Sequence, residues 1–228
     1  MKRTLSLLLC AVILSICAAP SFAKDKDENI YYCHKNNEQR IALTFDDGPH
    51  PRYTPKILEI LKKYGVKATF FVIGQNIEYY PGIVEQIIAD GHEIGNHTYR
   101  HKHTRMLDED TFCKDVSRCD GMLFEKCDYN IKLFRPPEGY VDEKVRMISK
   151  ELGYSIILWN IDTRDWAHET PYMIEQNIIN NISAGDIILM HDYVSGENST
   201  IEALDRVIPK LLDENYKFVS VSELIKND

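Results

Sequence analysis

Two adjacent carboxylates, Asp46 and Asp47, end an apolar segment and are followed by a Gly-Pro turn in the sequence TFDDGPH. Adjacent aspartates are also common in loops and at helix N-termini, so this segment alone fits a structural role as well as a chemical one. Neighbouring side chains of an extended segment point to opposite faces. We therefore expect the two carboxylates to have different roles.

The segment HTYRH places two histidines, His97 and His101, four residues apart. If this stretch is helical, the two imidazoles share one face and suit a divalent transition metal, whereas in an exposed polar loop they need have no function. We expect His103, which lies nearby, to be a surface residue. Two histidines and one aspartate leave coordination positions open for water and substrate, which is typical of a catalytic metal site.

The rest of the chain alternates between strand-like and helix-like patterns, which must position these groups. Strands are predicted at residues 41–45, 68–73, 93–96, 132–134, 155–161, 186–190 and 218–221. Helices are predicted at residues 55–64, 81–90, 108–126, 142–152, 171–182 and 200–212, the first of them capped by Thr54 and ended by Gly65. About seven such alternations favour a parallel sheet, either doubly wound or rolled into an incomplete TIM-like barrel.

Polar side chains follow five of the predicted strands at their C-terminal ends. They are Asp46 and Asp47 after the first strand, His97 after the third, Arg135 after the fourth, Asp162 and Asp165 after the fifth, and His191 after the sixth. In a parallel barrel all these ends open on one face, so residues far apart in the sequence can converge there.

Five segments in this order, TFDDGPH, HTYRH, FRPPEGY, DTRDW and LMHD, resemble the polysaccharide deacetylase family, which is the NodB-homology domain or carbohydrate esterase family 4. Five ordered motifs over residues 38–226 are more specific than any one of them. The resemblance implies an α/β fold, a distorted and incomplete TIM-like (β/α)7 barrel in a single domain. It also implies a metal-dependent hydrolase that removes N-acetyl groups from N-acetylglucosamine-type glycan, peptidoglycan or chitin-like, and releases acetate.

Carried over position by position, the resemblance implies a ligand set and a catalytic set. The metal ligands would be Asp47, His97 and His101, usually for zinc, with other divalent metals such as cobalt or manganese as alternatives. The catalytic residues would be Asp46 as base, His191 as acid, Arg135 holding Asp46, and Asp165 orienting His191.

The same resemblance implies residues that contact the substrate. They are Pro137 and Glu138 of the RPPEG segment, with Trp166 and Leu189 as apolar walls around the acetyl methyl. Ordinary core packing is the alternative for Trp166 and Leu189. Glu138 stands where the family commonly has tyrosine, but its backbone N–H can still donate to the oxyanion, so we expect activity to persist and substrate preference to change.

The N-terminus has the order of a secretory signal peptide: Lys2 and Arg3, an apolar run over residues 5–17, and Ser-Phe-Ala at 21–23. The run is shorter than the roughly 20 residues that span a bilayer, which disfavours an uncleaved anchor. We predict a signal peptide at 1–23, an N-terminal extension at 24–37 and a deacetylase domain at 38–228. The protein would be exported, to an extracellular, cell-surface or periplasmic location.

The net charge argues against two classes of partner, whereas a carbohydrate partner is what the family resemblance implies. Signal cleavage removes two cations and takes the formal net charge from −8 to −10, and no Lys/Arg cluster remains. Nucleic acids and anionic membranes are therefore not expected to bind, nor is a stable membrane span expected after cleavage. The sequence makes no prediction of an oligomeric state.

Four cysteines remain after the predicted cleavage: Cys33, Cys113, Cys119 and Cys127. An even number in an oxidising compartment favours two disulfides. On one helix, Cys113 and Cys119 would lie about 9 Å apart along the axis and could not bridge each other. Two of the three possible connectivities therefore remain, and we favour pairing Cys33 with Cys113 and Cys119 with Cys127, because the chain could turn back at Gly121. Free thiols or a soft-metal site are the alternatives to disulfides.

Two other functions fit the motifs. One is an O-acetyl esterase on an acetylxylan-like glycan, because the same attack cleaves both bonds. The other is a catalytically silent carbohydrate-binding protein, although such a protein would not need the base Asp46 and the acid His191 on opposite sides of a metal.

Overall fold

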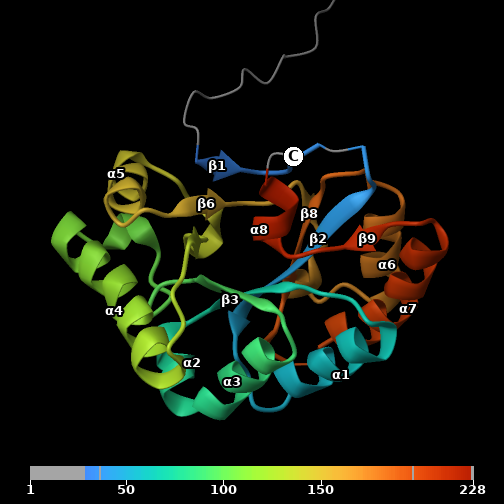
Figure 1. Cartoon of the computed structure of the whole chain (residues 1–228), viewed down its shortest axis with the longest axis horizontal. Helices are drawn as coiled ribbons and strands as arrows, with labels where there is room; N and C mark the ends of the chain where they lie inside the picture. Colours follow the sequence, from blue (N-terminus) through green and yellow to red (C-terminus); the bar gives the residue numbers. More distant parts are fainter. Residues whose placement is uncertain (1–28, 36, 197, 227–228) are drawn as a thin grey trace, which may run out of the picture.

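The computed structural model describes residues 29–35, 37–196 and 198–226, whose strands form one curled parallel sheet (Figure 1). Their order is β1-β6-β5-β4-β3-β2-β8-β7, with β9 paired to β2. The strands are β1 Ile30–Tyr31, β2 Arg40–Gly48, β3 Thr69–Val72, β4 Glu93–Asn96, β5 Leu133–Phe134, β6 Ser155–Ile157, β7 Ile161–Asp162, β8 Ile187–His191 and β9 Lys217–Phe218. The predicted distorted, incomplete α/β barrel is confirmed.

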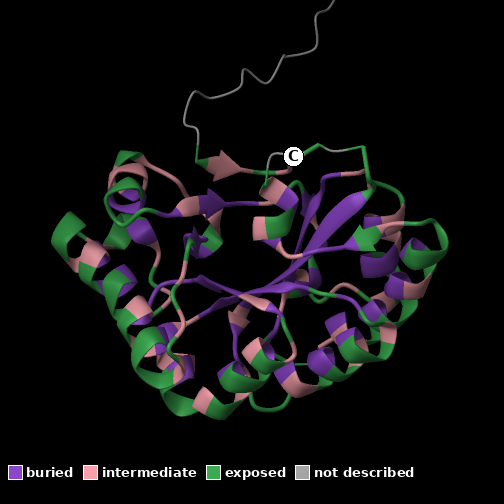
Figure 2. Ribbon diagram, viewed as in Figure 1, coloured by how far each residue is buried: buried purple, intermediate pink, exposed green. Residues whose placement is uncertain are grey.

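Most helices lie on the outside of the curled sheet, and most residues of the central strands are buried (Figures 1 and 2). The α-helices are α1 Thr54–Tyr64, α2 Gly74–Tyr79, α3 Pro81–Ala89, α4 Glu109–Cys127, α5 Glu143–Glu151, α6 Pro171–Ile179, α7 Thr200–Asp213 and α8 Val221–Ile225. Three short 3₁₀ turns are η1 Thr104–Met106, η2 Pro137–Gly139 and η3 Asp165–Ala167. In α1, Pro55 lies in the first turn, one residue after the helix begins, and Gly65 ends the helix with φ 68°, as the sequence predicts for Gly65.

The alternation of side chains along β2 separates two cores. Ile41, Leu43 and Phe45 belong to the large outer core beneath α1 and α7. Ala42 belongs to an inner core on the other face, where α8 contributes Leu224. Because alternate residues share a face, Thr44 and Asp46 continue the inner face toward the C-terminal end of the strand. The barrel interior therefore opens on the predicted site.

Some elements differ from the prediction. Ile30–Tyr31 forms β1, which pairs with β6, although the sequence placed this segment in an extension outside the domain. The predicted strand 155–161 is two strands, and residues 218–221 divide between β9 and the start of α8. Two-residue strands carry no period that a sequence pattern can reveal. The boundary between extension and domain remains a prediction.

The predicted disulfides are absent: all four cysteines of the described residues are free. Cys113, Cys119 and Cys127 lie on one helix, α4, which continues through Gly121 without turning back. Eight residues of helix separate Cys119 from Cys127 by about 12 Å along the axis, so this predicted bridge is wrong. Cys119 is fully buried in the outer core and serves there as an apolar side chain.

The predicted signal peptide lies outside the described residues. Within the described part of the chain, no helix is both long enough and apolar enough to cross a membrane.

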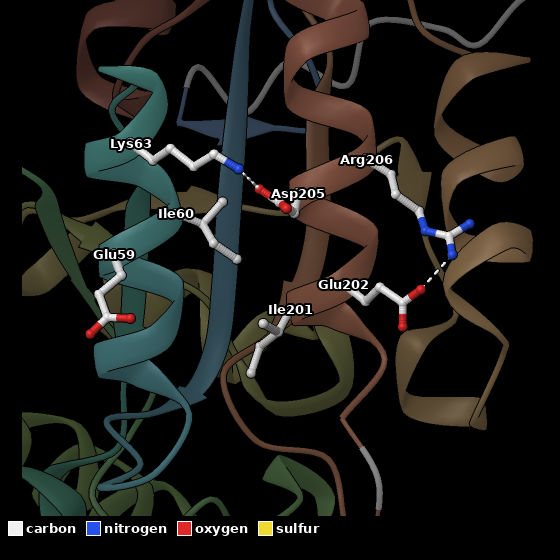
Figure 3. A pocket seen from close by; sticks show the side chains of 7 residues that line it. All are labelled: Glu59, Ile60, Lys63, Ile201, Glu202, Asp205 and Arg206. Atoms are coloured by element: carbon white, nitrogen blue, oxygen red, sulfur yellow. Dashed lines mark hydrogen bonds and ion pairs between the residues drawn. The ribbon is translucent and has the colours of Figure 1, made fainter.

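An open depression on the outer surface lies between α1 and α7 (Figure 3). Four of its charged side chains form two pairs, Lys63 Nζ with Asp205 Oδ1 at 2.5 Å and Arg206 with Glu202. It contains none of the predicted site residues, which lie instead at the mouth of the barrel.

Candidate active site

The predicted site residues converge at the C-terminal ends of adjacent strands. Asp46 and Asp47 lie in β2, His97 directly follows β4, and Arg135 directly follows β5. His191 ends β8 and is the register partner of Asp46 across the β2–β8 pair. Strand ends that are distant in sequence therefore form one site, as the alternation of elements predicts.

Three side chains form a candidate metal site. One donor atom from each of Asp47, His97 and His101 lies within 4.8 Å of the others. Asp47 Oδ1 is 3.6 Å from His97 Nε2 and 3.2 Å from His101 Nε2, and this buried oxygen has no hydrogen-bond partner among the described residues. A carboxylate oxygen without a donor, facing two imidazole nitrogens, fits a divalent cation. The structure thus brings the predicted ligands together.

The ring of His97 is oriented for this role by the backbone. Its Nδ1 donates to the carbonyl oxygen of Arg135 at 2.7 Å, which leaves Nε2 with a free lone pair toward Asp47. Burial lowers the pKa of His97, and the neutral imidazole is the form that binds metals.

The backbone at Asp47 differs from the expectation for an extended pair. Asp47 has φ 69°, and the pairing with β3 shifts register between Asp46 and Gly48. This bulge turns Asp47 toward the site, so both carboxylates face His97: its Nε2 is 3.7 Å from Asp46 Oδ2 and 3.6 Å from Asp47 Oδ1. The prediction that the two side chains point to opposite faces is wrong.

The HTYRH segment is also not helical. Thr98 and His101 both have positive φ, 66° and 51°, and the turn they make brings the rings of His97 and His101 to a centroid distance of 4.9 Å. The histidines meet through a loop and not through the i, i+4 spacing of a helix.

Asp46 forms a buried pair with Arg135. Arg135 Nη1 donates to Asp46 Oδ1 at 2.7 Å and to the hydroxyl of Thr44 at 2.8 Å, and its other nitrogens donate to the carbonyls of Ile157 and Leu158. Burial alone would raise the pKa of Asp46, but the charges of Arg135, His97 and His191 and the Arg135 hydrogen bond hold it below its usual value. Asp46 is therefore an ionised carboxylate.

His191 forms the second polar pair, with Asp165. The backbone N–H of His191 donates to Asp165 Oδ2 at 2.8 Å, and its Nδ1 donates to Oδ1 at 2.7 Å, while Thr200 supplies a further hydroxyl to Oδ2. Burial alone would lower the pKa of His191, but the hydrogen bond and charge of Asp165, with the charges of Asp46 and Asp47, raise it to about 9. The imidazole is thus protonated at neutral pH.

The predicted substrate contacts lie around these pairs. Trp166 is 52% exposed, and its indole N–H donates to Asp162. Leu189 is buried, but it lies on the same inner face of β8 as His191. This position is compatible with the predicted apolar contact to the acetyl methyl.

Glu138 follows the buried Pro137 in η2 and has φ 58°. Its side chain is 63% exposed, and its Oε2 lies 3.3 Å from His103 Nε2. His103 is partly buried and paired with Glu138, whereas the sequence predicted a surface residue.

Sequence reasoning missed one further carboxyl group, Asp192, which is fully buried. Thr54 donates its hydroxyl to Asp192 Oδ2 at 2.7 Å, and the Asp192 N–H donates to the carbonyl of Asp46 at 2.9 Å. Burial raises the pKa of Asp192 to about 7. A Cβ at Gly48 would lie 1.9 Å from Asp192 Oδ2, which explains the glycine in TFDDGPH. The only sequence signal was its position directly after His191.

The prediction that Thr54 caps α1 is wrong, because the N-cap residue is Tyr53 and Thr54 is the first residue of the helix. Its hydroxyl instead accepts from the backbone N–H of His50 at 2.7 Å and so joins the end of the Asp46–Asp47 segment to Asp192.

Comparison with known proteins gives concordant matches. The family model described as polysaccharide deacetylase matches residues 34–157. The chain is 42% identical over 194 residues to a peptidoglycan-N-acetylglucosamine deacetylase of Bacillus cereus, covering 84% of this chain and 90% of that protein. The crystal structure of a peptidoglycan N-acetylglucosamine deacetylase matches with a TM-score of 0.83 at 34% identity, over 88% of this chain and 94% of that one. A family 4 acetyl xylan esterase of Clostridium thermocellum, in complex with a cobalt ion, matches with a TM-score of 0.75 at 32% identity, over 81% and 89%.

Proposed function

Because the chain belongs to the polysaccharide deacetylase family, we propose that it is a zinc-dependent enzyme that removes the N-acetyl group from N-acetylglucosamine units of peptidoglycan. The observation that carries this proposal is the unpartnered oxygen of Asp47 facing two histidines, with an ionised Asp46 beside His97 and a protonated His191 paired in register with Asp46. The similarity to deacetylases of peptidoglycan supports the choice of polymer. Export by the predicted signal peptide would bring the enzyme to that polymer.

The proposed reaction is a hydrolysis of the acetamide. When held by Asp47, His97 and His101, zinc would supply Lewis acidity for the attacking water and the acetamide carbonyl. Asp46 takes a proton from that water, and Arg135 keeps the carboxylate ionised and oriented.

Two further groups complete the reaction. By the family resemblance, the backbone N–H of Glu138 donates to the oxyanion that develops as the water oxygen bonds to the carbonyl carbon. His191, protonated and held by Asp165, donates its Nε2 proton to the sugar nitrogen as the C–N bond breaks. Acetic acid and the free amine are the products, and the acid ionises to acetate by releasing its proton to solvent. The proton taken by Asp46 is balanced by the proton that returns to His191, which restores both groups.

A panel of substrates tests the proposed function. The zinc-loaded protein is incubated with peptidoglycan, chitooligosaccharides and acetylxylan, and acetate and free amines are measured. We expect equal amounts of acetate and amine, greatest with peptidoglycan. Acetate without amine, greatest with acetylxylan, would instead support an esterase, in line with the similarity to the acetyl xylan esterase. Glycan binding without acetate from any substrate would contradict an enzymatic function.

The pKa of His191 predicts the alkaline limit of activity. A pKa of about 9 lies above the ordinary value near 6.5, so the acid form is complete at neutral pH and is lost as the pH rises through 9. In Asp165→Asn, we expect the alkaline limb of the kcat profile to move to lower pH, because the negative charge that stabilises the imidazolium is gone. Asp162→Asn is a matched control, since Asp162 bonds Trp166 and not His191. An unchanged alkaline limb in Asp165→Asn would refute this role.

The side chain of Glu138 affects preference more than turnover. We expect Glu138→Tyr to lower kcat by less than about tenfold, because losing an oxyanion donor typically lowers turnover on the order of 10²–10³-fold and the backbone N–H remains. The ratio of kcat/KM between peptidoglycan and chitooligosaccharides should change. His103→Gln serves as the control for loss of the ion pair alone. If turnover instead falls by about 100-fold or more, as on loss of an oxyanion donor, the carboxylate itself takes part in catalysis.

A further inference from the structure

The loop that carries both histidine ligands depends on one buried amide, that of Asn96. Asn96 is fully buried at the end of β4, and its Oδ1 accepts from the backbone N–H of Thr98 at 2.7 Å. The hydroxyl of Thr98 in turn accepts from the backbone N–H of His101 at 3.0 Å. Two hydrogen bonds therefore run from Asn96 to the second histidine ligand, past the first one at His97.

Thr98 needs this support because of its backbone. Its φ of 66° lies in the left-handed region, which is unfavourable for a β-branched residue and persists only where surrounding contacts maintain it. The Asn96 bond closes this turn, and the Gly74 N–H donates to the carbonyl of Thr98 at 3.0 Å from the other side. The turn at Thr98 sets the direction of the chain between His97 and His101.

Asn96 is itself held by groups from two other elements. Its Nδ2 lies 2.8 Å from Asp120 Oδ1 and 3.0 Å from the carbonyl of Val116, both on α4. It also lies 3.2 Å from the hydroxyl of Tyr154, and that hydroxyl donates to Asp120 Oδ2. Both oxygens of Asp120 are thus used, one for Asn96 and one for Tyr154. The amide cannot turn without breaking several bonds in a buried environment.

We propose that Asp120, Tyr154 and Asn96 are positioning residues of the metal site, which act through the Thr98 turn to set the placement of His97 and His101. None of the three contacts the ligand set directly through a side chain. A second contact also attaches this loop to α4, because Asp115 accepts from the backbone N–H and Nε of Arg100. Loss of the Asp120 tie should therefore loosen the turn while the loop remains attached.

The test compares two aspartates of the same helix. Asp120→Ala removes the carboxylate that accepts from both Asn96 and Tyr154, whereas Asp110→Ala removes a carboxylate that pairs with Lys114 on the exposed face. Zinc affinity is measured by competition with a chelator on the metal-free protein, and the visible spectrum of the cobalt-loaded protein reports ligand geometry. We expect Asp120→Ala to weaken zinc binding by about tenfold or more and to change the cobalt spectrum, as loss of groups that orient ligands usually does. Asp110→Ala should match the wild type in both.

Two further variants separate positioning from general stability. Tyr154→Phe removes one hydroxyl and is the test variant if Asp120→Ala does not fold. We expect it to weaken zinc binding and to change the cobalt spectrum, both to a smaller degree than Asp120→Ala. Asp120→Asn keeps an acceptor oxygen for Asn96 and should restore affinity to within a few-fold of the wild type.

The proposal is overturned if the folded variants bind zinc with wild-type affinity and give the wild-type cobalt spectrum, even where their melting temperatures fall. The inference rests on the metal site of the proposed function, but its failure is distinguishable. A wild-type chain that binds no zinc contradicts the proposed function, whereas equal affinities in wild type and variants contradict only the positioning role.

Discussion

Asp46→Asn is expected to lower acetate release by about 10²–10⁴-fold while the bound zinc stays at the wild-type level. Asparagine keeps an oxygen that can accept from Arg135 Nη1, so the buried guanidinium retains a partner. It cannot accept the proton of the attacking water. Asp46 lies outside the candidate ligand set of Asp47, His97 and His101, so the metal should remain.

The measurement is acetate release together with zinc content for the same preparation. Asp110→Asn, an exposed change on α4, controls for the substitution itself, and the melting temperature shows whether the fold is intact. Wild-type turnover in a zinc-loaded, folded Asp46→Asn would contradict the assignment of the base. Loss of zinc from this variant would instead place Asp46 among the ligands.

His97→Ala is expected to abolish both zinc binding and turnover. His97 is 2% exposed and its Nε2 faces Asp47. Alanine at this position supplies no metal-binding atom and leaves a cavity where the imidazole was. We expect zinc affinity to fall by more than about 100-fold, beyond the 10–100-fold typical for groups that only orient ligands.

His92→Ala is the matched control for this change. His92 is also buried, but it is not in the candidate ligand set, and its Nδ1 accepts from the backbone N–H of Ala68. Both variants should lose stability, but only His97→Ala should lose zinc and acetate release. Full zinc occupancy in His97→Ala would rule out the proposed ligand set.

The site could be predicted where its residues follow strand ends. Asp46, His97, Arg135 and His191 each end or follow a strand of the parallel sheet, and a parallel barrel brings such ends to one face. The identity of the partners was also predictable from the motifs, since Arg135 bonds Asp46 and Asp165 bonds His191 as the resemblance implies.

The local backbone could not be predicted in the same way. Asp47, Thr98, His101 and Glu138 all have positive φ, which no hydrophobic period reveals and which is uncommon for residues other than glycine. The bulge at Asp47 turned an expected pair of opposed carboxylates into a pair that faces one site. Strain of this kind is typical of functional loops, where the surrounding structure maintains it.

Long-range packing explains the remaining differences. Asp120, Tyr154 and Asp192 look like ordinary helix, strand-flanking or loop residues in the sequence. Only the fold shows that Tyr154 and Asp192 are buried, and that Asp120 bonds both Asn96 and Tyr154. The disulfide prediction failed for the same reason, because Gly121 reads as a turn signal but lies within a 19-residue helix whose packing overrides its low helix propensity.

Zinc titration of the metal-free protein tests the central claim most directly. Acetate release from peptidoglycan is measured as zinc is added, with free amine determined on the glucosamine units. We expect no acetate without metal, a rise that saturates at one zinc per chain, and one amine for each acetate. Absence of acetate above the protein-free background at every zinc concentration, from a folded protein that binds zinc, would contradict the account.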